Sequence, residues 1–126
     1  MQKLWSLLLI VFFVAPTVFA ADADSIEGTY KCKGSDPYIN KDYTGTVTIT
    51  KNGKVYNFDM HYYTGEASKG TGLLRNDMLM LVCQDPANVK DSTCIEYYAI
   101  SKHDKKLVGE WVYLGKNKIG KETCSK

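Results

Sequence analysis

Four cysteines constrain the fold of this 126-residue chain more than any other feature of its sequence. Cys83 and Cys94 flank one predicted loop, whereas Cys32 and Cys124 lie near the two ends of the predicted mature chain. An even number of cysteines in a small exported domain predicts disulfide bonds. Of the three possible connectivities, the nested one is therefore favoured, with the inner pair and the outer pair each bonded.

Zinc is the competing explanation for the cysteines. No two of them have the short C-x-x-C spacing of a zinc site, and His61 and His103 are far apart in the sequence. The sequence therefore predicts no metal ligand.

The first twenty residues predict a secretory signal peptide. Lys3 supplies a basic start, residues 4–14 form an apolar run interrupted only by Ser6, and Pro16 precedes a small-residue site that suits cleavage before Ala21. The run is short for a membrane span of ~20 residues, which disfavours the alternative of a retained anchor. We expect a mature domain over residues 21–126 that is secreted or periplasmic, an oxidising setting in which disulfides persist.

Composition excludes several classes of function. Sixteen basic and fourteen acidic residues give a net charge of +2, and the charges are interspersed. Neither nucleic acid nor an anionic membrane is therefore an expected partner. Gly70-x-Gly72 is too short for a phosphate-binding fingerprint and opens no helix, so no cofactor is expected.

Short β segments separated by turn residues run through the mature chain. Residues 43–50 alternate threonines with Gly45, Val47 and Ile49, which is the period of a sheet with one buried face. Asn52-Gly53 then favours a tight hairpin. The other segments are 27–33, 54–63, 67–74, 78–84, 93–101, 106–114 and 117–124.

One strand segment and two of the connections allow further predictions. Segment 78–84 is apolar on both faces, which predicts a central strand buried on both sides, with a short core helix as the alternative. Residues 34–44 predict an eleven-residue polar loop, and the connection 85–92 could hold a helical turn.

The outer cysteine pair decides between an open and a closed sheet. A Cys32–Cys124 bond brings the first and last strands within about 6 Å, which an up-and-down meander achieves by curling shut. We therefore predict an all-β fold, a single antiparallel up-and-down barrel of about eight strands. Such a barrel either packs its own interior or leaves room for one small ligand.

No set of side chains indicates catalysis. His61 shares a strand face with Asp59, but a solvated or cross-strand-paired histidine is favoured over a general base. Glu96 and Glu110 could form an inward carboxylate pair, although pairing with lysines on adjacent strands is favoured. His103 lies in a charged hairpin tip. The chain is therefore expected not to be an enzyme.

The tyrosines give the candidate protein-binding residues. Tyr38 and Tyr43 bracket the predicted polar loop, and exposed tyrosines are enriched in protein-binding surfaces. The alternative is that both rings fold back over the end of the barrel. The remaining aromatic residues singled out are expected to face the core: Tyr30, Tyr56, Tyr62, Tyr98 and Trp111.

Several runs together resemble a family of small exported bacterial proteins labelled fibronectin-binding protein. They cover nearly the whole mature chain: Gly28–Gly34, Asp36-Pro37-Tyr38, Tyr43–Val47, Tyr63–Glu66, Trp111–Gly115 and Gly120–Cys124. The resemblance implies a calycin-like, avidin-like barrel and attachment to a host matrix protein such as fibronectin. A cysteine equivalent to Cys83 is not usual in that family, so the inner bridge would be a local addition.

A second similarity points to a different class of binding protein. Tyr30, Cys32 and Gly34 are similar to the start of periplasmic lysozyme inhibitors, which are also small disulfide-closed barrels. The sequence thus predicts a non-enzymatic binding protein with a protein partner, a host matrix protein or alternatively lysozyme. Carriage of a small apolar ligand inside the barrel is the third alternative.

Overall fold

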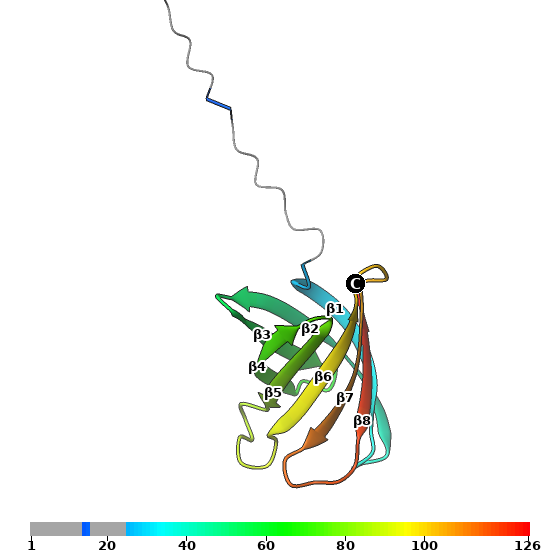
Figure 1. Ribbon diagram of the computed structural model, residues 1–126. Coiled ribbons are helices and arrows are strands. Elements are labelled where there is room, and N and C mark those ends of the chain that lie inside the picture. The colour runs from blue at the N-terminus through cyan, green and yellow to red at the C-terminus, as the bar shows by residue number, and fades with distance from the viewer. Residues whose placement is uncertain (1–13, 16–24) are drawn as a thin grey trace, which may run out of the picture.

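The computed structural model describes residues 14–15 and 25–126, so almost all of the predicted signal peptide lies outside the described residues. Residues 25–126 contain a closed barrel of eight antiparallel strands in sequence order (Figure 1). The strands are β1 (Gly28–Asp36), β2 (Lys41–Asn52), β3 (Val55–Tyr62), β4 (Ala67–Arg75), β5 (Met78–Gln84), β6 (Cys94–Ser101), β7 (Lys106–Tyr113) and β8 (Gly120–Ser125). The predicted all-β up-and-down barrel is confirmed. Within the described ranges, no helix is long and apolar enough to cross a membrane.

The alternation seen in the sequence separates the inside of the barrel from the outside. Val47 and Ile49 on β2 are fully buried, while the threonines between them lie on the outer side. The predicted hairpin between β2 and β3 is present, but Asn52 pairs with Val55, so the two turn residues are Gly53 and Lys54 and not Asn52 and Gly53. Gly53 lies in the left-handed backbone region at φ 61°. Phe58 and Met60 then point inward from β3. Hydrophobic burial along the barrel axis therefore follows the period of two that the sequence predicts.

Both predicted disulfides are present, and each joins residues that face one another across a strand pair. Cys32 pairs in register with Cys124 where β1 meets β8, and the Cys32–Cys124 bond crosses this closing seam. Cys83 pairs with Cys94 between β5 and β6, and these two residues are also bonded. The two disulfides are consistent with an extracellular or periplasmic location.

The predicted eleven-residue loop over residues 34–44 is wrong. β1 and β2 keep pairing as far as Asp36 and Lys41, so only residues 37–40 form the turn. The Asp36 carboxylate accepts a hydrogen bond from the backbone N–H of Tyr38 at 2.9 Å, and Asn40 adopts a positive φ of 56°. These are the local features by which Asp and Asn close a tight turn. Residues 85–93 form turns without a helix.

Candidate functional site

The outer surface of β4 to β7 is unusually apolar. Each of these strands turns large hydrophobic side chains outward, and their exposed fractions run from 38% to 56%. We call this surface the apolar wall, and its members are Leu73, Met78, Met80, Val82, Ile95, Tyr97 and Val108. A contiguous exposed apolar surface of this kind is typical of a site that binds another molecule.

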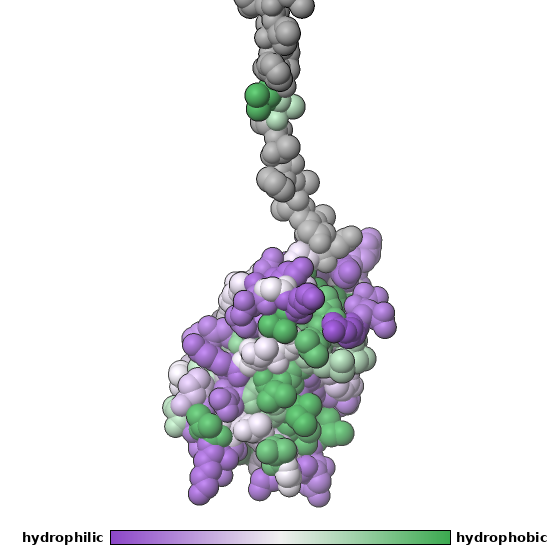
Figure 2. Space-filling model, turned by 60° about the vertical axis from the view of Figure 1, so that its left-hand side comes forward, coloured by the Kyte–Doolittle hydropathy of each residue, from purple (hydrophilic) through white to green (hydrophobic). Residues whose placement is uncertain are grey.

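The strand register makes the apolar wall continuous. Leu73, Met80 and Tyr97 are direct neighbours across β4, β5 and β6, and Val82 lies beside Ile95. Figure 2 brings this side of the barrel forward and shows apolar side chains gathered on it. The wall therefore offers one surface that a partner can cover in a single contact.

The apolar wall also corrects the prediction for segment 78–84. The segment is a strand, β5, but it is not buried on both faces. Leu79 and Leu81 point into the barrel, whereas Met80 and Val82 point out and are exposed. A closed barrel has only one interior, and no second layer packs on the outside of β5 among the described residues. Apolar residues on both faces of β5 thus indicate one core face and one exposed face.

The outer faces of β2 and β3 are polar over most of their length. β2 presents Thr48 and Thr50 outward, and β3 presents Asn57, Asp59 and His61. His61 Nε2 lies 3.2 Å from Asp59 Oδ1, and both side chains are well exposed. The His61 side chain is therefore largely in solvent, although the Asp59 Oδ1 atom itself is shielded from it. The polar side provides a reference surface for the apolar wall.

Tyr38 and Tyr43 both fold over one end of the barrel. The Tyr38 hydroxyl donates to the carbonyl of Lys118 at 2.5 Å and accepts from its N–H at 3.1 Å. The Tyr38 ring packs on Trp111 and Tyr113, with ring centroids 6.1 and 5.2 Å apart. This arrangement corresponds to the alternative in which both rings cover the barrel end. The role of Tyr38 and Tyr43 in protein binding stays a prediction.

Beneath these rings lie two buried acids. The Glu122 carboxylate accepts hydrogen bonds from the hydroxyls of Tyr98 and, at 2.9 Å, Tyr43. The Tyr43 hydroxyl in turn accepts from the indole N–H of Trp111 at 3.0 Å. Glu96 is 5% exposed, and its Oε1 has no hydrogen-bond partner. These residues form a polar network inside an otherwise apolar core.

Burial shifts the protonation of both acids. Burial raises the pKa of Glu96 well above its usual range, and the nearby Glu122 raises it further. Burial also raises the pKa of Glu122, while the hydrogen bonds from Tyr98 and Tyr43 oppose the shift. Neither of the two ion pairs found among residues 25–126 involves these carboxyl groups. Glu96 is therefore the member of the pair that holds its proton to higher pH.

Glu122 is the functional-looking residue that the sequence analysis missed. It lies between Gly120 and Cys124 on β8, and Cys124 must point inward to reach Cys32, so the period of two places Glu122 inside as well. Glu110, considered above as the inward partner of Glu96, instead lies on the outside of β7. There its carboxylate accepts a hydrogen bond from Tyr97 at 3.0 Å.

The surroundings of Glu122 do not suit a metal ion. Its carboxylate lies near the sulfur atoms of Cys32 and Cys124. Those sulfurs are bonded to each other and offer no thiolate. In the network instead, Tyr43 and Tyr98 donate to Glu122 as a shared acceptor, and Trp111 donates to the Tyr43 hydroxyl.

Glycines make the space that this aromatic network needs. A Cβ atom at Gly120 would collide with the Trp111 ring, one at Gly109 with Tyr98, and one at Gly34 with Tyr43. Each glycine thus faces one of the rings that reach toward Glu122. The absence of a side chain at these positions is a packing requirement.

Replacing Gly120 with alanine is expected to lower the free energy of unfolding by about 1–3 kcal/mol, because Trp111 must shift out of its position. Urea unfolding followed by Trp111 fluorescence measures the loss. Lys121→Ala is the control, since Lys121 points outward from the same strand. Equal stability of the two variants would contradict this account of Gly120.

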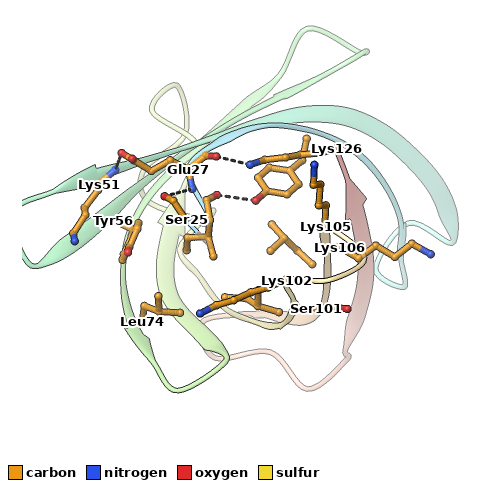
Figure 3. Close-up of a pocket in the computed structure, with 14 residues that line it drawn as sticks. Ser25, Glu27, Lys51, Tyr56, Leu74, Ser101, Lys102, Lys105, Lys106 and Lys126 are labelled. Atoms are coloured by element: carbon orange, nitrogen blue, oxygen red, sulfur yellow. Dashed lines mark hydrogen bonds between the residues drawn. The ribbon is translucent and has the colours of Figure 1, made fainter. Parts of the chain in front are cut away.

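The opposite end of the barrel is open as far as residues 25–126 are concerned. A cavity of about 620 Å³ lies where β1 begins and β8 ends, and Figure 3 looks into it. Tyr30, Leu74, Ile100 and Leu107 are among the residues that line it. The lysines that also border it are Lys51, Lys102, Lys105, Lys106 and Lys126. The barrel therefore has one end covered by aromatic rings and one end with a basic opening.

By its geometry, the protein belongs to the class of small antiparallel barrels closed by a disulfide, and it has an exposed apolar wall. Comparison with known proteins finds no family model that matches the chain and no curated protein that matches it.

Proposed function

We propose that this chain is an exported, non-enzymatic binding protein that holds a partner protein against the apolar wall. The proposal rests on the contrast between the apolar outer surface of β4 to β7 and the polar outer surface of β2 and β3. Seven large apolar side chains are exposed on β4 to β7, while β2 and β3 expose threonine, asparagine and charged residues. Aromatic residues and methionine are enriched at the centres of protein interfaces, and the wall contains Tyr97, Met78 and Met80.

The two disulfides and the predicted signal peptide support a place of action outside the cytoplasm. Disulfides persist in secreted and periplasmic proteins and stabilise a small domain there. The resemblance to the proteins labelled fibronectin-binding makes a host matrix protein the first partner to test, and fibronectin is the probe.

The double variant Val82→Glu, Ile95→Glu tests the proposal. It places two carboxylates at neighbouring positions in the row of the wall that lies next to the Cys83–Cys94 bond. Immobilised fibronectin is expected to bind this variant at least about tenfold more weakly than the unmodified protein, since two uncompensated charges covered by a partner cost more than about 1.4 kcal/mol.

Thr50→Glu, Asn57→Glu is the matched control, because these two residues are also cross-strand neighbours but lie on the polar side. It is expected to bind fibronectin like the unmodified protein. If both double variants bind fibronectin equally well, the apolar wall is not the binding site. Binding of lysozyme but not of fibronectin by the unmodified protein would favour the inhibitor class instead.

A further inference from the structure

We propose that the open end of the barrel is a second binding site, which takes a small amphipathic anion such as a carboxylate with an apolar tail. This inference is independent of the apolar wall and goes beyond the proposed protein-binding function. It rests on the shape of the cavity, the chemistry of its floor and the charge of its rim.

The cavity has the size and the floor of a small-molecule site. Its volume of about 620 Å³ lies within the range of about 300–1,000 Å³ typical of ligand pockets. Leu74, Ile100 and Leu107 supply aliphatic surface, and the Tyr30 and Tyr56 side chains supply aromatic surface. The Tyr30 hydroxyl is already satisfied, since it donates to the carbonyl of Ile26 at 2.7 Å. The floor therefore favours an apolar group.

The rim is cationic. Figure 3 shows Lys102 reaching across the cavity toward Leu74, whereas Lys51 and Lys106 point away from the cavity. Lys105 and Lys126 lie next to each other, joined by the hydrogen bond from the Lys126 N–H to the Lys105 carbonyl at 3.2 Å. We call Lys102, Lys105 and Lys126 the lysine rim.

Among residues 25–126, few carboxylates neutralise the lysine rim. Within that range Glu27 is the one acid that lines the cavity, and its carboxylate accepts a hydrogen bond from the backbone N–H of Lys51 at 2.6 Å. Lys102 lies 4.0 Å from the exposed Asp77, and neither of the two ion pairs found among residues 25–126 includes Lys105 or Lys126. Lys126 donates to the Glu27 carbonyl at 2.6 Å and keeps further N–H donors.

The charge of this whole end of the barrel also favours an anionic ligand. Its strand ends and turns carry seven basic residues, which are Lys51, Lys54, Arg75, Lys102, Lys105, Lys106 and Lys126. The acidic residues of this end that the structure describes are Glu27, Asp77 and Asp104. The described part of this end thus carries a surplus of positive charge, while the whole chain has a net charge of only +2. An anionic head group at the rim gains charge-assisted hydrogen bonds, while its tail covers the apolar floor.

Calorimetric titration of the full chain with decanoate tests this site. We expect saturable binding of one decanoate per chain. The double variant Lys102→Glu, Lys105→Glu is expected to bind at least about tenfold more weakly, because the rim then repels the head group. Lys102→Arg, Lys105→Arg keeps the charge and is expected to keep binding.

Three controls make the result specific. Lys116→Glu, Lys118→Glu changes the same number of charges in the turn at the other end and is expected to leave decanoate binding unchanged. Decylammonium, which has the same tail and a cationic head, is expected not to displace decanoate. Thermal unfolding of each variant verifies that the barrel is folded.

Several outcomes would overturn the proposal. They are a failure of decanoate to saturate the unmodified chain, an equal loss in the two lysine-to-glutamate variants, and displacement by decylammonium. Loss of decanoate binding in Val82→Glu, Ile95→Glu but not in the rim variant would show that decanoate binds to the apolar wall instead. Fibronectin binding by the rim variant is expected to be unchanged, so the two sites fail or succeed separately.

Discussion

Replacing both Cys32 and Cys124 with alanine is expected to lower the free energy of unfolding by about 4 to 5 kcal/mol. The two residues are 92 positions apart, and in the chain-entropy model a bond that closes so long a loop restricts the unfolded chain strongly. The bond also holds β1 against β8, the pair that closes the barrel. Because small domains are stable by only about 5–15 kcal/mol, we expect a variant close to unfolding at physiological temperature.

The inner disulfide provides the comparison. Cys83 and Cys94 are 11 positions apart, so Cys83→Ala, Cys94→Ala is expected to cost about 3 kcal/mol. Urea unfolding of both double variants, followed by circular dichroism, gives the two values. A variant without the inner bond that is less stable than the one without the outer bond would contradict this order.

The free energy of unfolding is also expected to fall as the pH rises above about 4.5, the ordinary pKa of glutamate. Burial raises the pKa of both Glu96 and Glu122 in the folded protein, so the folded state binds more protons than the unfolded chain does. The stabilisation is complete below the unfolded pKa and is lost as the pH rises through the folded values. Each proton contributes a slope of at most about 1.4 kcal/mol per pH unit.

Glu96→Gln isolates this effect. The amide has the same shape without an ionisable proton, and the groups that face it, Glu122 and Tyr98, can both accept hydrogen bonds from it. The variant is expected to have a flatter dependence of stability on pH and to be more stable than the unmodified protein at pH 8. Urea unfolding at several pH values between 4.5 and 8 measures the slope.

Glu110→Gln is the control for the pH experiment, because Glu110 lies on the outside of β7 beside Tyr97. It is expected to leave the slope unchanged. If Glu96→Gln is destabilised equally at every pH, then Glu96 acts through packing alone and the account of its buried proton is wrong.

The fold was predictable because two independent signals agree. The alternation around Val47 and Ile49, followed by the turn signal at Asn52-Gly53, indicates strands with one buried face. Pairing Cys32 with Cys124 then requires those strands to curl shut. Local patterning defines each strand, and the covalent constraint defines how the strands close.

The candidate sites were less predictable, because they depend on which residues become neighbours. The apolar residues on the outward face of β5 are typical of a strand buried on both sides. Only the closed barrel shows that no second layer among the described residues covers this face. The lysine rim combines residues from the β6–β7 turn with Lys126, which the pairing of β7 with β8 brings together. The pairing of Glu96 with Glu122 likewise joins two strands that are not adjacent in the barrel.

The two ends of the described barrel chain, Ser25 and Lys126, meet at the same opening. A fusion partner or surface tether attached at either end would therefore stand over the cavity and leave the side of the barrel clear. Tethering through the C-terminus would present the apolar wall to a partner while obstructing small anions. Tethering through a cysteine introduced at Thr50, on the polar side, would leave both surfaces accessible.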